Sequence, residues 1–205
     1  MEILDLGRRG YVETLELQRA LVLARAAGER PDTILLVEHE SVVTVGRRGR
    51  GGAAFEPHGA VPVVEVERGG EATYHGPGQA VVYPIVFLPE GRRDLHAFLR
   101  GLEEAVIATL AEFEVPGERV PGKTGVFVHG KKVASIGVAV SRWVTYHGAA
   151  LNVRTDLAYF SGFAPCGLPS SVMGNAGPYL PEAVTPHEVG LALASNAARL
   201  LVPSG

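Results

Sequence analysis

GVFVHGKKVASIGVAVSRWVTYHGAALNV, residues 125–153, is the stretch that decides the fold class. Apolar and β-branched residues flank His129 and Gly130, a pair that suits a tight turn, so residues 125–141 predict a β-hairpin. Residues 143–153 continue the pattern and predict a third strand. Strands joined by short turns are antiparallel, so this stretch predicts an antiparallel sheet.

The rest of the chain adds strands and helices around this hairpin. Apolar segments bounded by Gly, Pro or Asp predict strands at 2–6, 33–39, 41–46, 61–68 and 80–88. Apolar residues three to four apart predict helices over 11–28 and 94–114, and a third helix begins after Thr185, where Glu188 completes a capping-box pattern. We therefore expect an α+β fold: one domain, residues 1–205, with a mostly antiparallel or mixed sheet flanked by helices.

Composition limits the classes of function. The chain has 205 residues, of which 46% are hydrophobic and 20% charged, so it can bury a core and is not disordered. Its net charge of −3 gives no basic excess, so we expect no nucleic-acid partner. The N-terminal residues lack a signal-peptide pattern and no apolar run is long enough to span a bilayer, so we expect a cytoplasmic protein without a membrane partner.

Metal-ligand patterns are missing from the sequence. The single cysteine, Cys166, excludes an internal disulfide and a cysteine-rich metal site. The seven histidines show no H-x-x-x-H spacing. We therefore expect no metal.

A glycine-rich segment, RGGEATYHGPGQ at 68–79, is the first candidate for a site. No Lys follows its glycines as in a P-loop, and the next residues form a strand pattern where a dinucleotide-binding loop needs a helix. A structural turn and a substrate loop remain open, because glycine lets the backbone approach a ligand closely. The tetrapeptide TYHG recurs at 145–148, so two His-Gly edges could meet at one site if their strands are neighbours.

Cys166 and Lys132 are the candidates for covalent chemistry. Cys166 lies in FAPCGLPSS, where two prolines and a glycine indicate a constrained loop; it is either a small buried apolar residue or a nucleophile that needs a nearby base or cation. By strand parity Lys132 shares a face with Ala134 and Ile136, where desolvation would favour the neutral amine and make it a proton acceptor. The alternative is that Lys131 and Lys132 are both solvated beside the turn.

Several long motifs, in order, closely resemble the lipoyl (octanoyl) transferase family over about residues 36–168. They are EHESVVTVGRR, RGGEATYHGPGQAVVYP, GKKVASIGVAVSRWVTYHGAALNV and APCG. The resemblance implies an acyltransferase that moves an octanoyl (or lipoyl) group from acyl carrier protein to a lysine of lipoyl domains, the first step of endogenous protein lipoylation. These acceptors are the lipoyl domains of 2-oxo acid dehydrogenases and the glycine cleavage H protein. It also implies a fold similar to lipoate and biotin protein ligases, and no cofactor, because thioester exchange needs no ATP.

The resemblance also assigns residues. Its acyl-thioester cysteine matches Cys166, and its catalytic lysine matches Lys132, which leaves Lys131 a bystander. Its substrate contacts match Arg68, Gly69, Gly70, Glu71, Ala72, Thr73, Tyr74 and His75 in the loop, Ser135, Ile136 and Gly137 in one strand, and Gly148, Ala149 and Ala150 in the next. After Cys166 the chain reads LPSSVMGN and departs from the family's Val-Thr-Ser type segment.

Two other functions stay open. The arginine-rich segment GRRGRGG at 46–52 either binds phosphate through its guanidinium groups or is a solvated loop. It also resembles the nucleotide-binding loop of biotin ligases. An ATP-dependent lipoate or biotin protein ligase is therefore the alternative enzyme, and a non-catalytic acyl- or protein-binding module is the third. Docking of acidic carrier proteins would use Arg47, Arg48, Arg50, Arg92 and Arg93.

Overall fold

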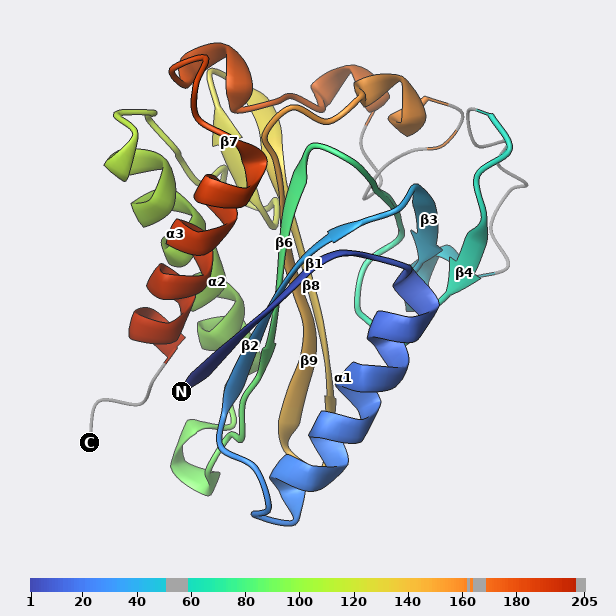
Figure 1. Ribbon diagram of the computed structural model, residues 1–205, viewed down its shortest axis with the longest axis vertical. Helices are drawn as coiled ribbons and strands as arrows, with labels where there is room; N and C mark the ends of the chain where they lie inside the picture. Colours follow the sequence, from blue (N-terminus) through green and yellow to red (C-terminus); the bar gives the residue numbers. More distant parts are fainter. Residues whose placement is uncertain (51–58, 162, 164–168, 202–205) are drawn as a thin grey trace.

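The computed structural model describes residues 1–50, 59–161, 163 and 169–201. Its main sheet has six strands in the order β1-β2-β6-β9-β8-β7, and a smaller sheet has the order β4-β3-β5 (Figure 1). The strands of the main sheet are β1 (Glu2–Arg9), β2 (Thr33–His39), β6 (Gln79–Ile85), β7 (Val126–Val128), β8 (Lys131–Ser141) and β9 (Val144–Asn152). The strands of the smaller sheet are β3 (Val42–Val45), β4 (Val63–Glu65) and β5 (Ala72–His75). Both sheets are mixed, because β1 runs parallel to β2 and β3 runs parallel to β4 while the other pairs are antiparallel.

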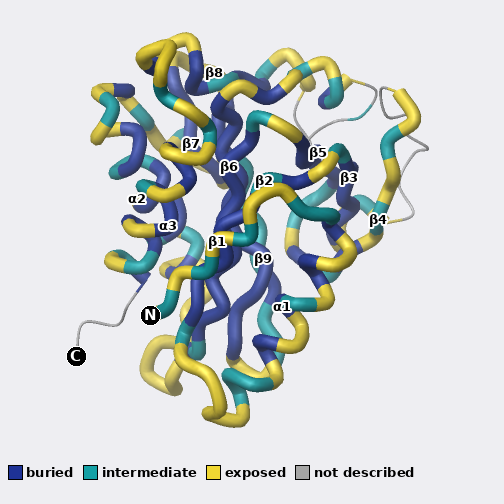
Figure 2. The backbone as a smooth tube through the Cα atoms, in the orientation of Figure 1, coloured by how far each residue is buried: buried dark blue, intermediate teal, exposed yellow. Residues whose placement is uncertain are grey.

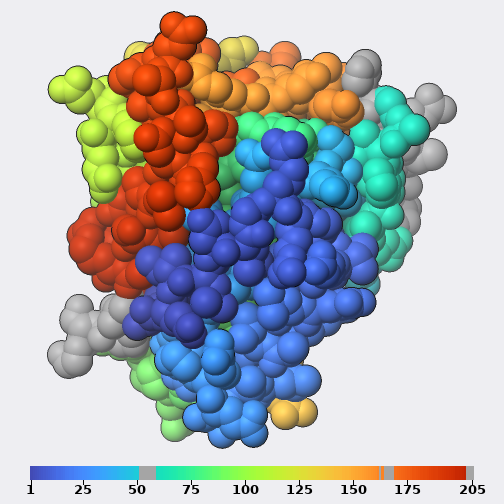
Figure 3. All heavy atoms as spheres, in the orientation of Figure 1, coloured from blue at the N-terminus to red at the C-terminus, as the bar shows by residue number. Residues whose placement is uncertain are grey.

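In the described part of the chain, three α-helices cover the main sheet. They are α1 (Tyr11–Ala26), α2 (Leu95–Glu112) and α3 (Pro186–Leu201). Short 3-10 helices occur in several of the connecting segments. In Figure 1, α2 and α3 lie on one face of the sheet and α1 lies on the other. Figure 3 shows the N-terminal residues, in blue, covering much of the face turned to the viewer. The α+β class expected from the sequence is confirmed.

Strand alternation explains why both faces of the sheet are covered. Within β2, Ile34 and Leu36 pack in the cluster that contains α2 and α3, whereas Leu35 and Val37 pack in the cluster that contains α1. Successive side chains of a strand point to opposite faces, so an unbroken apolar run such as this one needs a layer on each side. The central strands are accordingly buried along most of their length, as the dark blue of Figure 2 shows.

The ends of α2 and α3 follow from local side chains. Asp94 accepts hydrogen bonds from the amides of His96 and Ala97 at the start of α2. At the start of α3 the Thr185 amide donates to the Glu188 carboxylate, and the Glu188 amide donates to Thr185 Oγ1. This reciprocal pair is the predicted capping box, and it is confirmed.

The structure corrects some predicted boundaries. The strand expected at 61–68 is only Val63–Glu65, and the strand expected at 80–88 is Gln79–Ile85. Inside the segment that the sequence indicated as a loop, Ala72–His75 forms β5. Four residues between glycines are too few for periodicity to be visible, and β5 is specified by its antiparallel pairing with β3. No helix in the described ranges is long and apolar enough to cross a membrane.

Candidate active site

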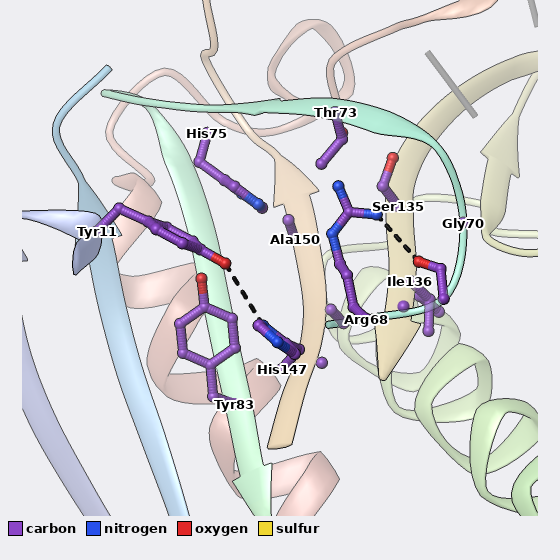
Figure 4. A pocket seen from close by; sticks show the side chains of 14 residues that line it. Tyr11, Arg68, Gly70, Thr73, His75, Tyr83, Ser135, Ile136, His147 and Ala150 are labelled. Atoms are coloured by element: carbon purple, nitrogen blue, oxygen red, sulfur yellow. Dashed lines mark hydrogen bonds between the residues drawn. The ribbon is translucent and has the colours of Figure 1, made fainter. Parts of the chain in front are cut away.

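A pocket lies where three predicted segments converge (Figure 4). The first segment is the loop from Arg68 into β5, and the other two are the middle parts of β8 and β9. Antiparallel pairing sets Ser135 opposite Ala150, Ile136 opposite Ala149 and Gly137 opposite Gly148. The two strand motifs are therefore cross-strand partners that form one wall together.

Most of the predicted substrate residues line this pocket. They are Arg68, Gly69, Gly70, Thr73, His75, Ser135, Ile136, Gly137, Gly148, Ala149 and Ala150. Ala72 and Tyr74 face away from it and pack with Phe160 and Met173, because alternate residues of β5 point to opposite sides. Glu71 is half-buried and does not line the pocket.

Arg68 holds the loop in its shape. Its side chain is 6% exposed, and one guanidinium nitrogen donates to the carbonyls of Gly69 and Glu71, each at 3.0 Å. The other nitrogen donates to the carbonyl and the hydroxyl of Thr44, each at 2.8 Å. Arg68 therefore joins the loop to β3 and brings a positive charge to the pocket.

Two glycines allow the close approach of backbone around the pocket. Gly70 has a φ of +85°, a conformation that L side chains rarely adopt. A Cβ on Gly148 would lie 2.2 Å from the carbonyl oxygen of Val82. The glycines of these motifs thus shape the wall of the pocket.

Histidines and tyrosines form one end of the pocket, and sequence reasoning missed several of them. Figure 4 shows Tyr11, His75, Tyr83 and His147 turned toward one another. Tyr11 stacks on His75 with ring centroids 5.7 Å apart, and its hydroxyl lies 3.4 Å from Nδ1 of His147. Of this group only His75 was a predicted site residue. The repeated TYHG was the one signal for His147, and the two histidines do line one pocket although their strands belong to different sheets.

Hydrogen bonds fix which ring nitrogens carry protons. His75 Nδ1 lies 2.8 Å from Oε1 of Gln79, whose amide nitrogen donates to the Tyr74 carbonyl and to Asn152 Oδ1. Because Gln79 Oε1 can only accept, His75 donates from Nδ1, and its Nε2 is the acceptor left for the pocket. His39 likewise donates from Nδ1 to the carbonyl of Arg9, so its Nε2 accepts from the Tyr83 hydroxyl at 2.8 Å.

Burial keeps these rings uncharged. Burial lowers the pKa of His39 to about 4, and burial with the nearby charge of Arg68 lowers the pKa of His147 to about 3. Burial, and then the neighbouring His39, hold the pKa of His75 well below its usual value. Burial also raises the pKa of Tyr83 well above that of a free tyrosine. Near neutral pH this end of the pocket therefore presents neutral imidazoles and protonated phenols.

Two hydroxyl groups in the pocket wall have uncommitted hydrogen-bonding capacity. Thr73 Oγ1 and Ser135 Oγ are buried and have no hydrogen-bond partner among the described residues. The Gly69 amide is different, because it donates to the carbonyl of Val138 at 3.0 Å. The hydroxyls, and not that amide, can therefore donate to an oxygen of a bound substrate.

Lys132 opens into a second hollow that shares walls with the pocket. This hollow is lined by Lys132 and also by Gly69, Gly70, Ile136 and Gly137, all four of which line the pocket as well. Lys132 is only 2% exposed, and its Nζ makes no hydrogen bond or ion pair with any described residue. The predicted burial of Lys132 is confirmed.

Lys131 faces the other way. It is exposed, and its Nζ donates to the carbonyl of Ser171 at 2.7 Å. The two neighbouring lysines thus lie on opposite faces of β8, as strand parity predicts.

Cys166 lies outside the described residues. Phe163, which precedes it, packs against the apolar cluster that contains Tyr74, Phe160 and Met173, and Met173 follows it. Within the described ranges, no group of His, Cys, Asp and Glu side chains could hold a metal ion.

The proposed docking arginines differ in their environments. Arg50 lies 3.6 Å from the Glu65 carboxylate, and Arg93 stacks over the ring of Trp143 at 4.2 Å. Arg47 and Arg48 are exposed. Arg48 lines the second hollow.

Comparison with known proteins places the chain in a family. Residues 10–197 match the lipoyl protein ligase A/B catalytic domain. An octanoyltransferase of Geobacter metallireducens is 49% identical over 168 residues, which cover 82% of this chain and 78% of the relative. An octanoyltransferase of Syntrophobacter fumaroxidans is 43% identical over 203 residues, which cover 97% of this chain and 89% of the relative.

Solved structures share the fold at low sequence identity. A bipartite lipoate protein ligase of Thermoplasma acidophilum superimposes with a TM-score of 0.69 and 18% identity, over 98% of this chain and 83% of that one. The biotin protein ligase of Aquifex aeolicus gives 0.56 and 14%, over 98% and 68%. The predicted likeness to both kinds of ligase is confirmed for the fold. The sequence identities above show that the chain belongs to the octanoyltransferase family of lipoyl protein ligase A/B catalytic domains.

Proposed function

We propose that this chain transfers an octanoyl or lipoyl group from acyl carrier protein to a lysine of a lipoyl domain, through a thioester on Cys166. Membership of the octanoyltransferase family makes the chain an acyltransferase. The observation that carries the residue assignment is the buried Lys132, whose unpartnered Nζ lies at a hollow that shares Gly69, Gly70, Ile136 and Gly137 with the pocket of predicted substrate residues. A lysine in such surroundings serves as a proton acceptor for a nearby thiol.

In the first step the acyl group moves to the enzyme. Lys132 takes the proton of the Cys166 thiol, and the thiolate attacks the carbonyl carbon of the octanoyl thioester. A new carbon–sulfur bond forms, the bond to the carrier's sulfur breaks, and the Lys132 ammonium returns the proton to the departing thiolate. One thioester replaces another, so the step needs no ATP.

In the second step the acceptor lysine takes the acyl group. Its neutral ε-amine attacks the Cys166 thioester, an amide bond forms and the cysteine sulfur leaves. Lys132 removes the proton that the amine gives up and returns it to the Cys166 sulfur. Conversion of a thioester to an amide has a favourable free-energy change, so this step makes the transfer of the acyl group effectively irreversible.

The pocket walls can stabilise the oxyanion of both steps. Thr73 Oγ1 and Ser135 Oγ are buried hydroxyls without a partner among the described residues, so each can donate to the carbonyl oxygen of the acyl group. The Gly69 amide is not available for this role, because it already donates to the carbonyl of Val138. We assign the oxyanion contact to the two hydroxyls.

The proposal also names the acceptor domains of the acyl group and the cellular compartment of the enzyme. Lipoyl domains of 2-oxo acid dehydrogenases and the glycine cleavage H protein are the proposed acceptors, and the cytoplasm is the proposed compartment. We propose further that residues 1–205 act as a single catalytic domain without a cofactor or metal.

An ATP-dependent ligase is the alternative within the same fold. The ligase structures share only 14–18% identity with this chain, so they support the fold and not the reaction. The relatives at 43–49% identity are octanoyltransferases, which favours transfer from a thioester. A non-catalytic binding module, the third possibility, would bind acyl groups without turnover.

Transfer to an acceptor domain tests the proposal. Purified protein, octanoyl carrier protein and an unmodified lipoyl domain are mixed without ATP, and octanoylation of the domain is followed by mass spectrometry. We expect wild-type protein to modify the domain, and Cys166→Ala to be inactive. Dependence on ATP, or full activity of Cys166→Ala, would point to a ligase and reject the proposed mechanism.

A further inference from the structure

The second hollow has a cationic lining that the acyl pocket does not need. Besides Lys132, its walls include Arg48, from the arginine-rich segment, and Lys123, which precedes β7. None of the described residues that line it is an aspartate or a glutamate. An octanoyl chain is uncharged, so these cations have no role in holding it.

The charges of Arg48 and Lys123 are available to a ligand. Both side chains are exposed, and neither forms an ion pair with a carboxylate in the part of the chain that the structure describes. Arg50, two positions further along, contrasts with them because it is paired with Glu65. Exposed cations facing a common hollow without acidic neighbours attract anions, above all phosphate.

Lys132 supplies a second, independent indication of a ligand. A buried ammonium or amine without a partner is costly, so a polar partner is expected when the site is in use. Lys132 opens into the same hollow as Arg48 and Lys123. The α2 N-terminus contributes less, because Asp94 already accepts from the amides of His96 and Ala97.

The rest of the lining favours a narrow, flexible ligand over a nucleotide. Leu95, Leu99, Ile136 and Val138 provide an apolar wall, and Gly69, Gly70, Ile136 and Gly137 line both the hollow and the acyl pocket. Among the described residues, the only aromatic ring that lines the hollow is the imidazole of His96, so a purine finds no phenylalanine, tyrosine or tryptophan to stack on. A linear arm with a phosphate at its far end fits this combination.

We propose that the hollow binds the phosphopantetheine arm of the acyl donor. Arg48 and Lys123 contact the phosphate of the arm, and the apolar wall contacts its linear part. The proposal rests on the proposed function, because it names the portion of the thioester donor that lies outside the acyl pocket. Lys132 marks the end of the arm where its thioester reacts. The phosphate contacts would set the register of the arm, so that the thioester carbonyl stops beside Lys132.

The test compares two small donors that differ by a single phosphate. They are octanoyl-pantetheine and octanoyl-4′-phosphopantetheine, and kcat/KM for acyl-enzyme formation is measured with each by intact-protein mass spectrometry. We expect the wild-type protein to prefer the phosphorylated donor, and the ratio of the two values to fall about 3- to 10-fold in Arg48→Ala and in Lys123→Ala. Arg142→Ala is the control: it removes one exposed positive charge at a residue that neither lines the hollow nor belongs to the proposed docking arginines, and it should keep the wild-type ratio.

Each outcome bears on the proposal. A wild-type ratio of one, or wild-type ratios in both Arg48→Ala and Lys123→Ala, would overturn the phosphate site while leaving acyl transfer intact. Failure of both donors to acylate the protein would instead contradict the proposed function. In that case calorimetry with free 4′-phosphopantetheine and free pantetheine still tests the phosphate site. Tighter binding of the phosphorylated compound that is lost in Arg48→Ala would support the site, and equal affinities for the two compounds would reject it. Arg48-dependent binding of ATP without binding of phosphopantetheine would make the hollow a nucleotide site and reject the proposal.

Discussion

Lys132 is bridged to Met173 by a short parallel pairing, and the amide of Gly174 donates to the carbonyl of Lys132 at 3.0 Å. Met173 and Gly174 therefore lie directly beside the strand that carries the proposed proton acceptor. This pairing joins β8 to a part of the chain that lies 41 positions beyond Lys132.

Replacing Lys132 by methionine should slow acylation of Cys166. Methionine keeps the length and the burial of the side chain but removes the amine that accepts the thiol proton, so we expect a loss of about 10²–10⁴-fold at pH 7. Raising the pH should recover part of the rate, because hydroxide then generates the thiolate. Lys131→Met is the control, since Lys131 lies on the other face. Wild-type rates of acylation in Lys132→Met, measured in rapid-quench experiments, would refute the role of Lys132.

Substitution of His75 should weaken turnover without abolishing acylation. We propose that its Nε2, the free acceptor, contacts the substrate, so His75→Ala should lower kcat/KM about tenfold. His75→Asn keeps a donor to Gln79 but lacks the ring Nε2, so it should be as impaired as His75→Ala. Recovery of wild-type kcat/KM in His75→Asn would indicate that the ring only supports the loop, and complete loss of the acyl-enzyme would make His75 part of the chemistry.

Mild acid should destabilise the fold through its buried histidines. The unfolded chain protonates His39 below a pKa of about 6.5, whereas the folded chain does so only near 4, so the unfolded state binds more protons in this window. The stability that the neutral ring contributes is complete above pH 6.5 and is lost as the pH falls toward 4, by up to about 3 kcal/mol. Urea unfolding between pH 7 and 5 should show a smaller pH slope for His39→Gln than for the wild type. His96→Gln, at an exposed position on α2, should keep the wild-type slope; equal slopes for all three proteins would contradict the assignment.

Adding one methyl group at Gly148 should damage both stability and activity. The new Cβ would lie 2.2 Å from the Val82 carbonyl oxygen and 2.7 Å from Cδ of Pro84, so β9 must shift away from β6. We expect a loss of about 1–3 kcal/mol in the free energy of unfolding, together with a distorted pocket wall. Gly91→Ala is the control, because its Cβ meets nothing within 4 Å. Equal melting temperatures for the two variants would show that β9 adapts without cost.

Strand periodicity was enough to predict most of the main sheet and the two faces of β8. The alternation around Lys132 separates it from Lys131, and the structure confirms that one is buried and the other exposed. The capping-box pattern at Thr185 predicted the start of α3, because that signal depends only on residues within one turn of the helix.

The rest of the site depends on contacts between distant segments. Tyr11 reaches the pocket from the first turn of α1, and Tyr83 reaches it from β6, but in the sequence both belong to ordinary apolar patterns. β5 is a strand only because β3 lies beside it. Packing determines which side chains of the two sheets come into contact, and local sequence patterns do not predict these long-range contacts.

The most direct test of the account is the mass of the enzyme after brief exposure to octanoyl carrier protein in the absence of an acceptor and of ATP. We predict the addition of a single octanoyl group, mapped by peptide fragmentation to Cys166, and its loss when an unmodified lipoyl domain is added. Protein that keeps its original mass, or that carries the octanoyl group on a residue other than Cys166, would contradict the proposed mechanism.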